Sequence, residues 1–276
     1  MPELPEVETV CRGLAEALKG RQLVRIITRR PDLRFPLPND LGQRLTGHRI
    51  QAVKRRAKFI LIEFKTSDVL LSHLGMSGRF RIYHTAPPPE DRHDHVIFET
   101  NTGAVIRYND PRRFGFMVLT NRANLTTNRF LADLGPEPLE HTFTPDIFIS
   151  HIKNKKAPLK AALLNQHVVA GLGNIYACEA LFIARLSPRR TAGTVGPKRA
   201  AALVDAIKTV LVDAISKGGS SLRDHRQTNG ELGYFQHAFK VYGRENEACP
   251  RCGPGHPIKR LLQSGRSTFF CPHCQR

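Results

Sequence analysis

The chain begins with MPELPEVETV at residues 1–10, the stretch around which we expect the rest of the fold to be organised. If Met1 is removed, Pro2 becomes an N-terminal secondary amine, and an α-amino group has a pKa of about 7.7 to 8.0. Such an amine is a nucleophile near neutral pH, and amines attack electrophilic carbons to form Schiff bases. Because Glu3 adds an acid beside this amine, the stretch predicts the parts of a covalent catalytic site.

The same stretch also has a purely structural interpretation. Proline is favoured at the first helical position, and a carboxylate in the first turn stabilises the positive end of the helix dipole, as Pro5 and Glu6 would do. Apolar residues recur at helical spacing from Val7 to Leu18, and Gly20 ends the segment. Taken alone, these residues describe an ordinary capped helix, so the rest of the chain must decide between the two interpretations.

Composition limits the class of partner. A length of 276 residues suggests one or two domains, each able to bury its own core. The chain has 42 Lys and Arg against 24 Asp and Glu, and its net charge of +18 favours a polyanionic partner, first of all nucleic acid. An apolar run of about 18 residues and a secretory signal are both missing from the sequence. We therefore expect no membrane partner and a cytoplasmic location.

The first half of the chain predicts strands. Eight short segments rich in Val, Ile, Leu and Phe are separated by turns, and their regular spacing predicts a β-sandwich or barrel. They are 22–29, 48–54, 58–65, 69–74, 79–84, 94–100, 103–109 and 114–119.

The second half predicts helices. The segment 134–140 contains two prolines and a glycine and is typical of a linker. Beyond it, apolar residues recur at helical spacing in four segments, the third with Asn174 as its expected N-cap. These segments are 145–152, 158–165, 175–184 and 199–217.

Polar residues interrupt these elements where a core does not require them. Lys58 precedes the apolar run 59–62, where it is either functional or a solvated edge charge. Met76 lies between two glycines at a loop tip, and Arg112 and Phe114 share the next such loop. An arginine beside an aromatic ring suits insertion into a duplex, because apolar wedges unstack bases and arginine bonds base edges.

Further basic and glycine-rich segments lie in the second half. Three lysines at 153–156 and Lys160 form a cluster that we expect to face an anionic partner, although most such runs are solvated surface. The segment 171–174 can cradle an anion with free backbone amides, but it is too short to be specific. The polar loop 218–234 is long enough to suggest a functional role.

Two Cys-x-x-Cys pairs close the chain. Cys249 and Cys252 form the first pair, and Cys271 and Cys274 form the second after residues 253–270. This spacing predicts a four-cysteine zinc site that is structural, because four thiolates leave no open coordination position. Two histidines are possible substitute ligands, and two further cysteines are expected to be buried and inert. These are His256, His273, Cys11 and Cys178.

Together these motifs resemble the formamidopyrimidine-DNA glycosylase family of bacterial base-excision repair enzymes. The resemblance rests on PELPEVET at 2–9, the Lys58 stretch, HLGMSG at 73–78, DPRRFG at 110–115, GNIYA at 173–177 and the zinc finger. It implies an α+β fold that binds one structural Zn2+ and holds damaged double-stranded DNA as a monomer, associated with the nucleoid. The implied parts are a β-sandwich flanked by helices at 1–133, a linker at 134–142, a helical domain with a helix-two-turn-helix motif at 143–240 and a zinc finger at 241–276.

The resemblance also implies catalytic roles. Pro2 would attack C1′ of the damaged nucleotide and leave a Schiff base, and Glu3 would donate a proton to the sugar. Lys58 would donate the proton for β-elimination and Arg266, at the tip of a zinc-finger hairpin, that for δ-elimination. Glu6 would support the site.

The DNA contacts follow from the same resemblance. Met76, Arg112 and Phe114 would fill the gap left by a flipped nucleotide, with Arg112 facing the orphaned cytosine. The loop 218–234 would close over the base, an 8-oxoguanine or a ring-opened purine. Positions that match DNA-contacting residues of the family are His93, Arg112, Lys155, Lys160 and Asn174.

Two alternatives remain. An endonuclease VIII-like glycosylase for oxidised pyrimidines shares the Pro-Glu start, but it tends to have glycine where this chain has Leu4. A non-catalytic zinc-ribbon protein that binds nucleic acid would explain the charge and the cysteines but not Pro2 and Glu3. One departure from the family concerns the lesion: residues 218–221 read GGSS where GGTT is common.

Overall fold

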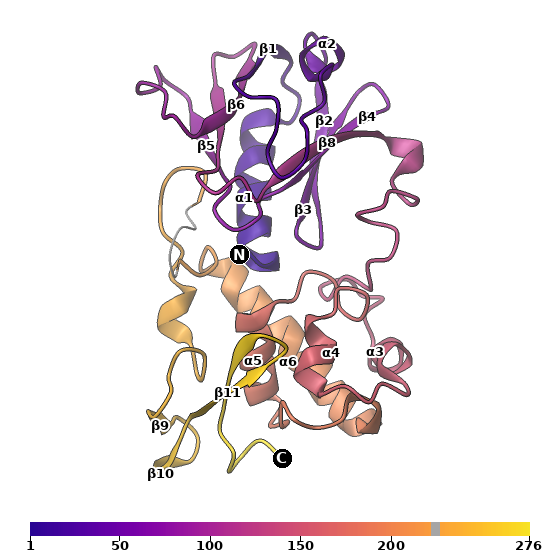
Figure 1. The fold of residues 1–276 in the computed structure, drawn as a ribbon, viewed down its shortest axis with the longest axis vertical. Helices are drawn as coiled ribbons and strands as arrows, with labels where there is room; N and C mark the ends of the chain where they lie inside the picture. Colours follow the sequence, from indigo (N-terminus) through magenta and orange to yellow (C-terminus); the bar gives the residue numbers. More distant parts are fainter. Residues whose placement is uncertain (222–226) are drawn as a thin grey trace. The chain divides into compact units, whose positions relative to one another are not determined.

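The computed structural model describes residues 1–221 and 227–276, which form two compact units (Figure 1). The first unit comprises Met1–Ala132 and the described part of Lys217–Tyr234. The second comprises Asp133–Ser216 and Phe235–Arg276. The segment proposed as a helical domain, 143–240, therefore contributes residues to both units.

The first unit holds two four-stranded antiparallel sheets, in the orders β1-β6-β7-β5 and β2-β3-β4-β8. All eight predicted strands are present, and two separate sheets make this a sandwich rather than a barrel. The elements are α1 (Leu4–Leu18), β1 (Leu23–Thr28), α2 (Leu41–Leu45), β2 (Ile50–Arg56), β3 (Phe59–Phe64), β4 (Asp68–His73), β5 (Arg79–Tyr83), β6 (Asp94–Thr100), β7 (Val105–Asn109), β8 (Phe116–Asn121) and η1 (Arg122–Asn124).

One apolar core joins both sheets to α1. Leu14 of α1, Ile62 of β3 and Phe98 of β6 belong to the same buried cluster. Each fully buried leucine or phenylalanine of this kind contributes about 1.5 to 3 kcal/mol relative to an exposed one. Helix α1 begins at Leu4, and Pro5 lies in its first turn, as the capped-helix interpretation predicts. The core therefore fixes the start of α1, which Pro2 and Glu3 directly precede.

The second unit is helical and ends in two small antiparallel hairpins, β9-β10 and β11-β12. The expected mixed α+β architecture with a C-terminal zinc-finger segment is thus confirmed. The elements are α3 (Pro145–Ile152), α4 (Leu159–Leu164), α5 (Asn174–Ile183), η2 (Ala192–Thr194), α6 (Pro197–Ser216), η3 (Phe235–Ala238), β9 (Ala248–Cys249), β10 (Gly253–Pro257), β11 (Lys259–Gln263) and β12 (Arg266–Phe270).

The expected N-cap of α5 is wrong. Helix α5 begins at Asn174 itself, and Gly173 is its N-cap. The Asn174 side-chain amide instead donates a hydrogen bond to the carbonyl of Ser267 at 2.9 Å. Asparagine is favoured as a helix cap by its local chemistry. Here its side chain instead binds a residue that lies 93 positions away in the sequence.

A buried glutamate ties α5 to the segment before the zinc finger. Glu179 is 1% exposed, and its Oε2 accepts from the Lys240 amide at 2.9 Å. Its Oε1 accepts from the amides of Val241 at 3.0 Å and Tyr242 at 2.8 Å. Burial raises the pKa of Glu179, and the three amide donors that converge on its carboxylate act in the opposite direction. This carboxylate therefore anchors the zinc finger to the helices of the same unit.

Among residues 1–221 and 227–276, none of the helices combines the length and the apolar composition needed to cross a lipid bilayer.

We expect Glu179→Gln to destabilise the second unit by about 2 to 4 kcal/mol, because a side-chain NH2 would then face a buried backbone donor. The free energy is measured by urea unfolding, with hydrogen exchange of α5 and β9 amides to locate the loss. The matched control is Glu245→Gln, which removes an exposed ion pair with Arg260 (3.6 Å) and should change stability by less than about 0.5 kcal/mol. Equal stability of the two variants would contradict the anchoring role.

Candidate functional site

The start of α1 is buried and polar. Pro2 is buried, and Glu3 and Glu6 are 5% and 2% exposed. The Glu3 amide donates to Glu6 Oε2 at 2.8 Å, as in a helix capping box. A carboxylate whose only role is to cap a helix is rarely buried, because an exposed cap costs less desolvation free energy. The arrangement gathers the Pro2 nitrogen and two acids in one place.

A partner that the sequence did not indicate completes this cluster. The second oxygen of Glu6, Oε1, accepts from the amide of Ser220 at 2.8 Å and from its hydroxyl at 3.0 Å. Gly219 makes the approach possible: its φ is +79°, and a Cβ there would lie 3.1 Å from Glu6 Cγ. Glu6 therefore joins the start of α1 to residues 218–221, the part of the chain with the family's glycine-and-hydroxyl pattern.

The loop 218–234, predicted to close over a base, is described only at its ends, since residues 222–226 lie outside the described residues. The Tyr234 amide donates to the Lys217 carbonyl at 2.9 Å, and the Gly233 amide donates to Ser221 Oγ at 2.8 Å. These bonds pair the two ends of the loop. Its closure over a base stays a prediction.

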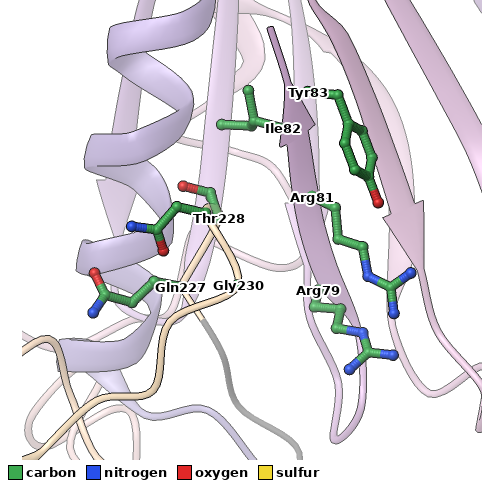
Figure 2. A pocket seen from close by; sticks show the side chains of 8 residues that line it. Arg79, Arg81, Ile82, Tyr83, Gln227, Thr228 and Gly230 are labelled. Atoms are coloured by element: carbon green, nitrogen blue, oxygen red, sulfur yellow. The ribbon is translucent and has the colours of Figure 1, made fainter. Parts of the chain in front are cut away.

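The segment 227–230 of this loop lies against β5. The Ile82 amide donates to the Thr228 carbonyl at 3.1 Å, and a pocket of about 210 Å³ lies beside this contact (Figure 2). The pocket is lined by Arg79, Arg81, Ile82, Tyr83, Gln227, Thr228, Asn229 and Gly230.

Lys58 is not a solvated edge charge. It lies with Ala57 in the two-residue turn between β2 and β3, and it is 6% exposed. Its positive charge acts on His73, whose pKa is lowered from 6.5 to about 4 by burial first and then by the charges of Lys58 and Arg34. His73 Nδ1 accepts from the Gly75 amide at 3.0 Å. A neutral histidine thus lies near the buried ammonium at neutral pH.

Two loops, 73–78 and 110–115, form what we call the probe loops. They expose the apolar side chains that the sequence singled out, Met76 by 39% and Phe114 by 44%. The exposed Arg112 places its guanidinium 4.8 Å from the centre of the Phe114 ring. The predicted wedge residues therefore do reach the surface, and their contact with DNA stays a prediction.

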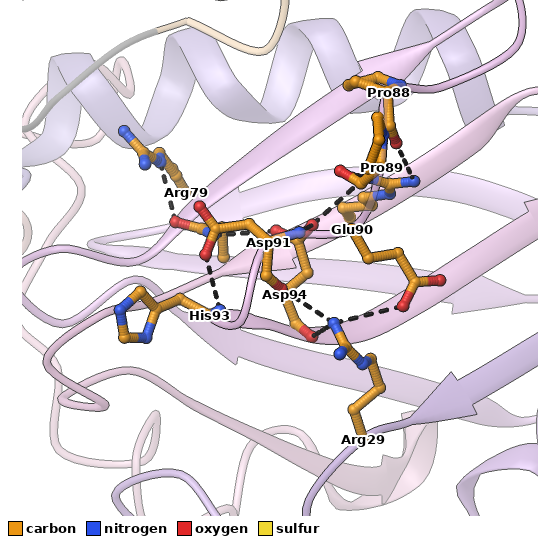
Figure 3. Close-up of polar contacts among 10 residues, drawn as sticks. Arg29, Arg79, Pro88, Pro89, Glu90, Asp91, His93 and Asp94 are labelled. Atoms are coloured by element: carbon orange, nitrogen blue, oxygen red, sulfur yellow. Dashed lines mark hydrogen bonds and ion pairs between the residues drawn. The ribbon is translucent and has the colours of Figure 1, made fainter.

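His93 lies in a loop that hydrogen bonds to Asp91 and Asp94 hold in place (Figure 3). Its amide donates to Asp91 Oδ1 at 2.7 Å, and the Asp91 amide donates to Asp94 Oδ2 at 3.0 Å. Asp94 pairs with Arg107 at 3.4 Å, with side chains 0% and 5% exposed. Residue types alone do not reveal this pair, because its members lie on two different strands. It fixes the backbone that carries His93.

In the second unit, two predicted DNA contacts hold the zinc-finger hairpin instead of facing solvent. Lys160 is 0% exposed, so the expected exposed cluster does not include it. Its Nζ donates to Thr268 Oγ1 at 2.7 Å and to the Ser267 carbonyl at 3.2 Å, and Asn174 also donates to that carbonyl. Arg266, the residue before Ser267, is exposed and begins β12 directly after the hairpin turn. Lys155 is half-buried.

The four cysteines converge as the spacing predicts. Their sulfur atoms all lie within 4.8 Å of one another, with Cys249–Cys274 at 3.9 Å and Cys252–Cys271 at 3.8 Å. Zinc bound tetrahedrally at about 2.3 Å places its sulfur ligands roughly 3.8 Å apart. The geometry thus fits one zinc ion. Within the described part of the chain, this convergent group contains neither His256 nor His273.

Stability of the first unit should depend on pH through His73. The unfolded chain binds a proton below about pH 6.5, whereas the folded chain resists protonation down to about pH 4, so stability should fall as pH drops through this window. The loss approaches about 3 kcal/mol. Hydrogen exchange of β4 amides at pH 7 and 5, corrected for intrinsic rates, measures it. The stability difference between pH 7 and pH 5 should shrink in His73→Asn, whereas His84→Asn, at an exposed histidine, should keep it. An unchanged difference in His73→Asn would refute the assignment.

Removal of zinc should unfold the hairpins β9–β12 and leave α1 intact, because the metal supplies much of the folding free energy of such small segments. The native chain should contain one zinc by elemental analysis, and Cys252→Ser should contain none. Hydrogen exchange then locates the damage. Cys11→Ala, at a buried cysteine outside the cluster, should keep its zinc. Full zinc content in Cys252→Ser would contradict the four-thiolate site.

Family models match three consecutive parts of the chain. Residues 1–117 match the formamidopyrimidine-DNA glycosylase N-terminal domain, and residues 134–226 match the H2TH domain of the same enzymes. Residues 246–276 match a zinc finger found in FPG and IleRS. The expected helix-two-turn-helix and zinc-finger regions are thus both recognised.

Whole proteins give the same result. The formamidopyrimidine-DNA glycosylase of Rhodopseudomonas palustris is 53% identical over 293 residues, covering all of both chains. The crystal structure of the Thermus thermophilus MutM (FPG) protein is 40% identical, with a TM-score of 0.87 over 99% of this chain and 98% of that one. The wild-type Lactococcus lactis Fpg, bound to DNA containing N7-benzyl-Fapy-dG, is 34% identical with a TM-score of 0.89 over all of both chains. This chain therefore belongs to the formamidopyrimidine-DNA glycosylase family of DNA repair enzymes.

Proposed function

We propose that this chain removes oxidised purines, such as 8-oxoguanine and formamidopyrimidines, from double-stranded DNA and then cuts the strand at the lesion. The observation that carries the proposal is the buried cluster of Pro2, Glu3 and Glu6 at the start of α1, held against Ser220. The name of the relatives supports the substrate class, as does the Fapy-type lesion in the DNA bound to the Lactococcus lactis protein. The net charge of +18 suits a DNA partner.

The first steps use the N-terminal amine. After Met1 is removed, the Pro2 nitrogen attacks C1′ of the flipped nucleotide, and the bond from C1′ to the base breaks. The electron pair leaves with the base, which takes up a proton. Glu3 donates a proton to the sugar ring oxygen, so the ring opens and a Schiff base joins Pro2 to C1′. A buried acid beside the amine suits this proton transfer, since proton donors act best when desolvated and fixed in place.

The strand is then cut by two eliminations. Loss of a proton from C2′ expels the 3′ phosphate, and a second elimination expels the 5′ phosphate. Lys58 is the proposed proton donor for the first step and Arg266 for the second. Lys58 suits its role because it is nearly buried, and because His73 beside it stays neutral and does not compete as a second cation. Zinc holds the segment that carries Arg266 and takes no chemical step.

DNA contacts complete the proposal. Met76, Arg112 and Phe114 would occupy the gap left by the flipped nucleotide, and His93, Lys155, Lys160 and Asn174 would act at the DNA backbone. For Lys160 and Asn174 the role would be indirect, since both hold Ser267 beside Arg266. The chain would act as a monomer on damaged double-stranded DNA.

Borohydride should trap the Met1-free chain on a duplex with 8-oxoguanine opposite cytosine, because it reduces a Schiff base to a stable covalent link. A chain that retains Met1 should give no cross-link, since its Pro2 nitrogen is an amide. Glu3→Gln should lose base excision by about 1,000-fold or more, the scale seen when a catalytic group is removed. The readouts are the cross-linked band and the cut strand on a denaturing gel, with N-terminal mass spectrometry of each sample.

The matched control is Glu16→Gln, at an exposed position of the same helix, which should behave as the native chain does. If Met1-free, zinc-loaded protein binds the duplex but neither cross-links nor cuts it, the catalytic proposal fails and the chain is a DNA-binding zinc-ribbon protein.

A further inference from the structure

One buried carboxylate connects the two probe loops. Asp110 follows the last residue of β7 and is 0% exposed. Its Oδ1 accepts from the Ser77 hydroxyl at 2.5 Å, in the loop that exposes Met76. Its Oδ2 accepts from the Gly115 amide at 2.8 Å, in the loop that exposes Phe114. The same side chain thus binds the residues next to both apolar tips.

Further hydrogen bonds extend this connection to the backbones of Arg112 and His93. Ser77 Oγ accepts from the Arg112 amide at 3.2 Å while it donates to Asp110, so it links the two loops a second time. The Asp110 amide donates to the His93 carbonyl at 3.1 Å. Tyr108 adds a third donor to the carboxylate at 3.3 Å. Every one of these groups belongs to the first unit.

Glycines let the loop backbones interlock around the carboxylate. A Cβ at Gly75 would lie 2.3 Å from the backbone carbon of Phe114. A Cβ at Gly115 would lie 1.8 Å from the Tyr108 hydroxyl and 2.7 Å from the His73 carbonyl. Neither distance can be relieved by a side-chain rotation alone, because backbone atoms are involved. Both positions therefore need glycine, because the two loop backbones approach too closely for a Cβ.

The chemistry around the Asp110 carboxylate favours rigidity. Hydrogen bonds are electrostatically stronger inside a protein than in water, and the bonds that converge on Asp110 are buried. The Asp110 carboxylate is buried, whereas the side chains at the tips of the loops that it connects are exposed. The entropy cost of ordering these loops is therefore met before any partner binds. Such preorganisation raises the efficiency of binding without adding a contact.

We propose that Asp110 and Ser77 are positioning residues that hold Met76, Arg112 and Phe114 as a single preformed wedge for the DNA duplex. The inference rests on the proposed function, because it takes these three side chains to enter DNA. It adds that the wedge acts as one body, and that two residues which touch no DNA set its geometry. The step that they serve is extrusion of the damaged nucleotide, not the chemistry at C1′.

The test compares two substrates in single-turnover assays. On a duplex with 8-oxoguanine opposite cytosine, Asp110→Asn and Ser77→Ala should slow base excision by about 100-fold, the scale of a misplacement near 1 Å. On a duplex with an abasic site, strand cutting should slow by less than about fivefold, since a site without a base costs little to extrude. The preference for cytosine over adenine opposite the lesion should also weaken, because Arg112 loses its position.

The matched control is Ser72→Ala. Ser72 is buried on β4 at 0% exposure, and no described residue shares a hydrogen bond with its hydroxyl. It should cut both substrates at the native rate. All variants are first compared by zinc content and thermal unfolding, so that the rates refer to folded protein.

The outcomes separate the two proposals. A native chain that neither excises 8-oxoguanine nor cuts the abasic duplex defeats the proposed function itself. An active native chain with variants that slow both substrates equally, or neither, defeats only the wedge inference. A 2-aminopurine beside the lesion gives an independent readout: its fluorescence should rise rapidly with native protein and slowly with Asp110→Asn, and equal rates would overturn the positioning role.

Discussion

The carboxylate of Glu6 is the interaction on which the candidate site depends. One oxygen caps the amide of Glu3 and the other binds the amide and hydroxyl of Ser220, so a single side chain fixes both the chain start and the segment 218–221. The apolar face of α1 packs into the core that joins both sheets, and this packing holds in place the helix that carries the carboxylate. The two interpretations of the first ten residues are therefore compatible, because the helix cap is also the support of the proposed nucleophile.

Local patterns predicted most of the architecture. The strands between residues 22 and 119 follow from alternating apolar segments and turn residues, and the cysteine spacing predicts the thiolate cluster that the structure contains. Such features depend on residues close in sequence or on a fixed spacing. The resemblance to a glycosylase family, drawn from six short motifs, is confirmed by full-length relatives.

Long-range partners account for what the sequence could not predict. Ser220 lies 214 positions from Glu6 in the sequence, and neither residue type indicates a contact with the other. Asn174 has the right chemistry for a helix cap, yet its amide binds Ser267. Lys160 lies close to an exposed lysine run in sequence but is buried against β12. In each case the residue type indicated a polar role, and only the tertiary fold decided which partner would fill it.

The interlocked glycines of the probe loops have an evolutionary consequence. Gly75 and Gly115 admit no larger side chain because backbone and buried hydroxyl groups occupy the space of a Cβ. A mutation at either position would disrupt the fold, and selection would eliminate it for that reason alone. The side chains at the loop tips are exposed and meet no such limit. The fold therefore tolerates substitution at the tips, whereas the two glycines beneath them cannot change.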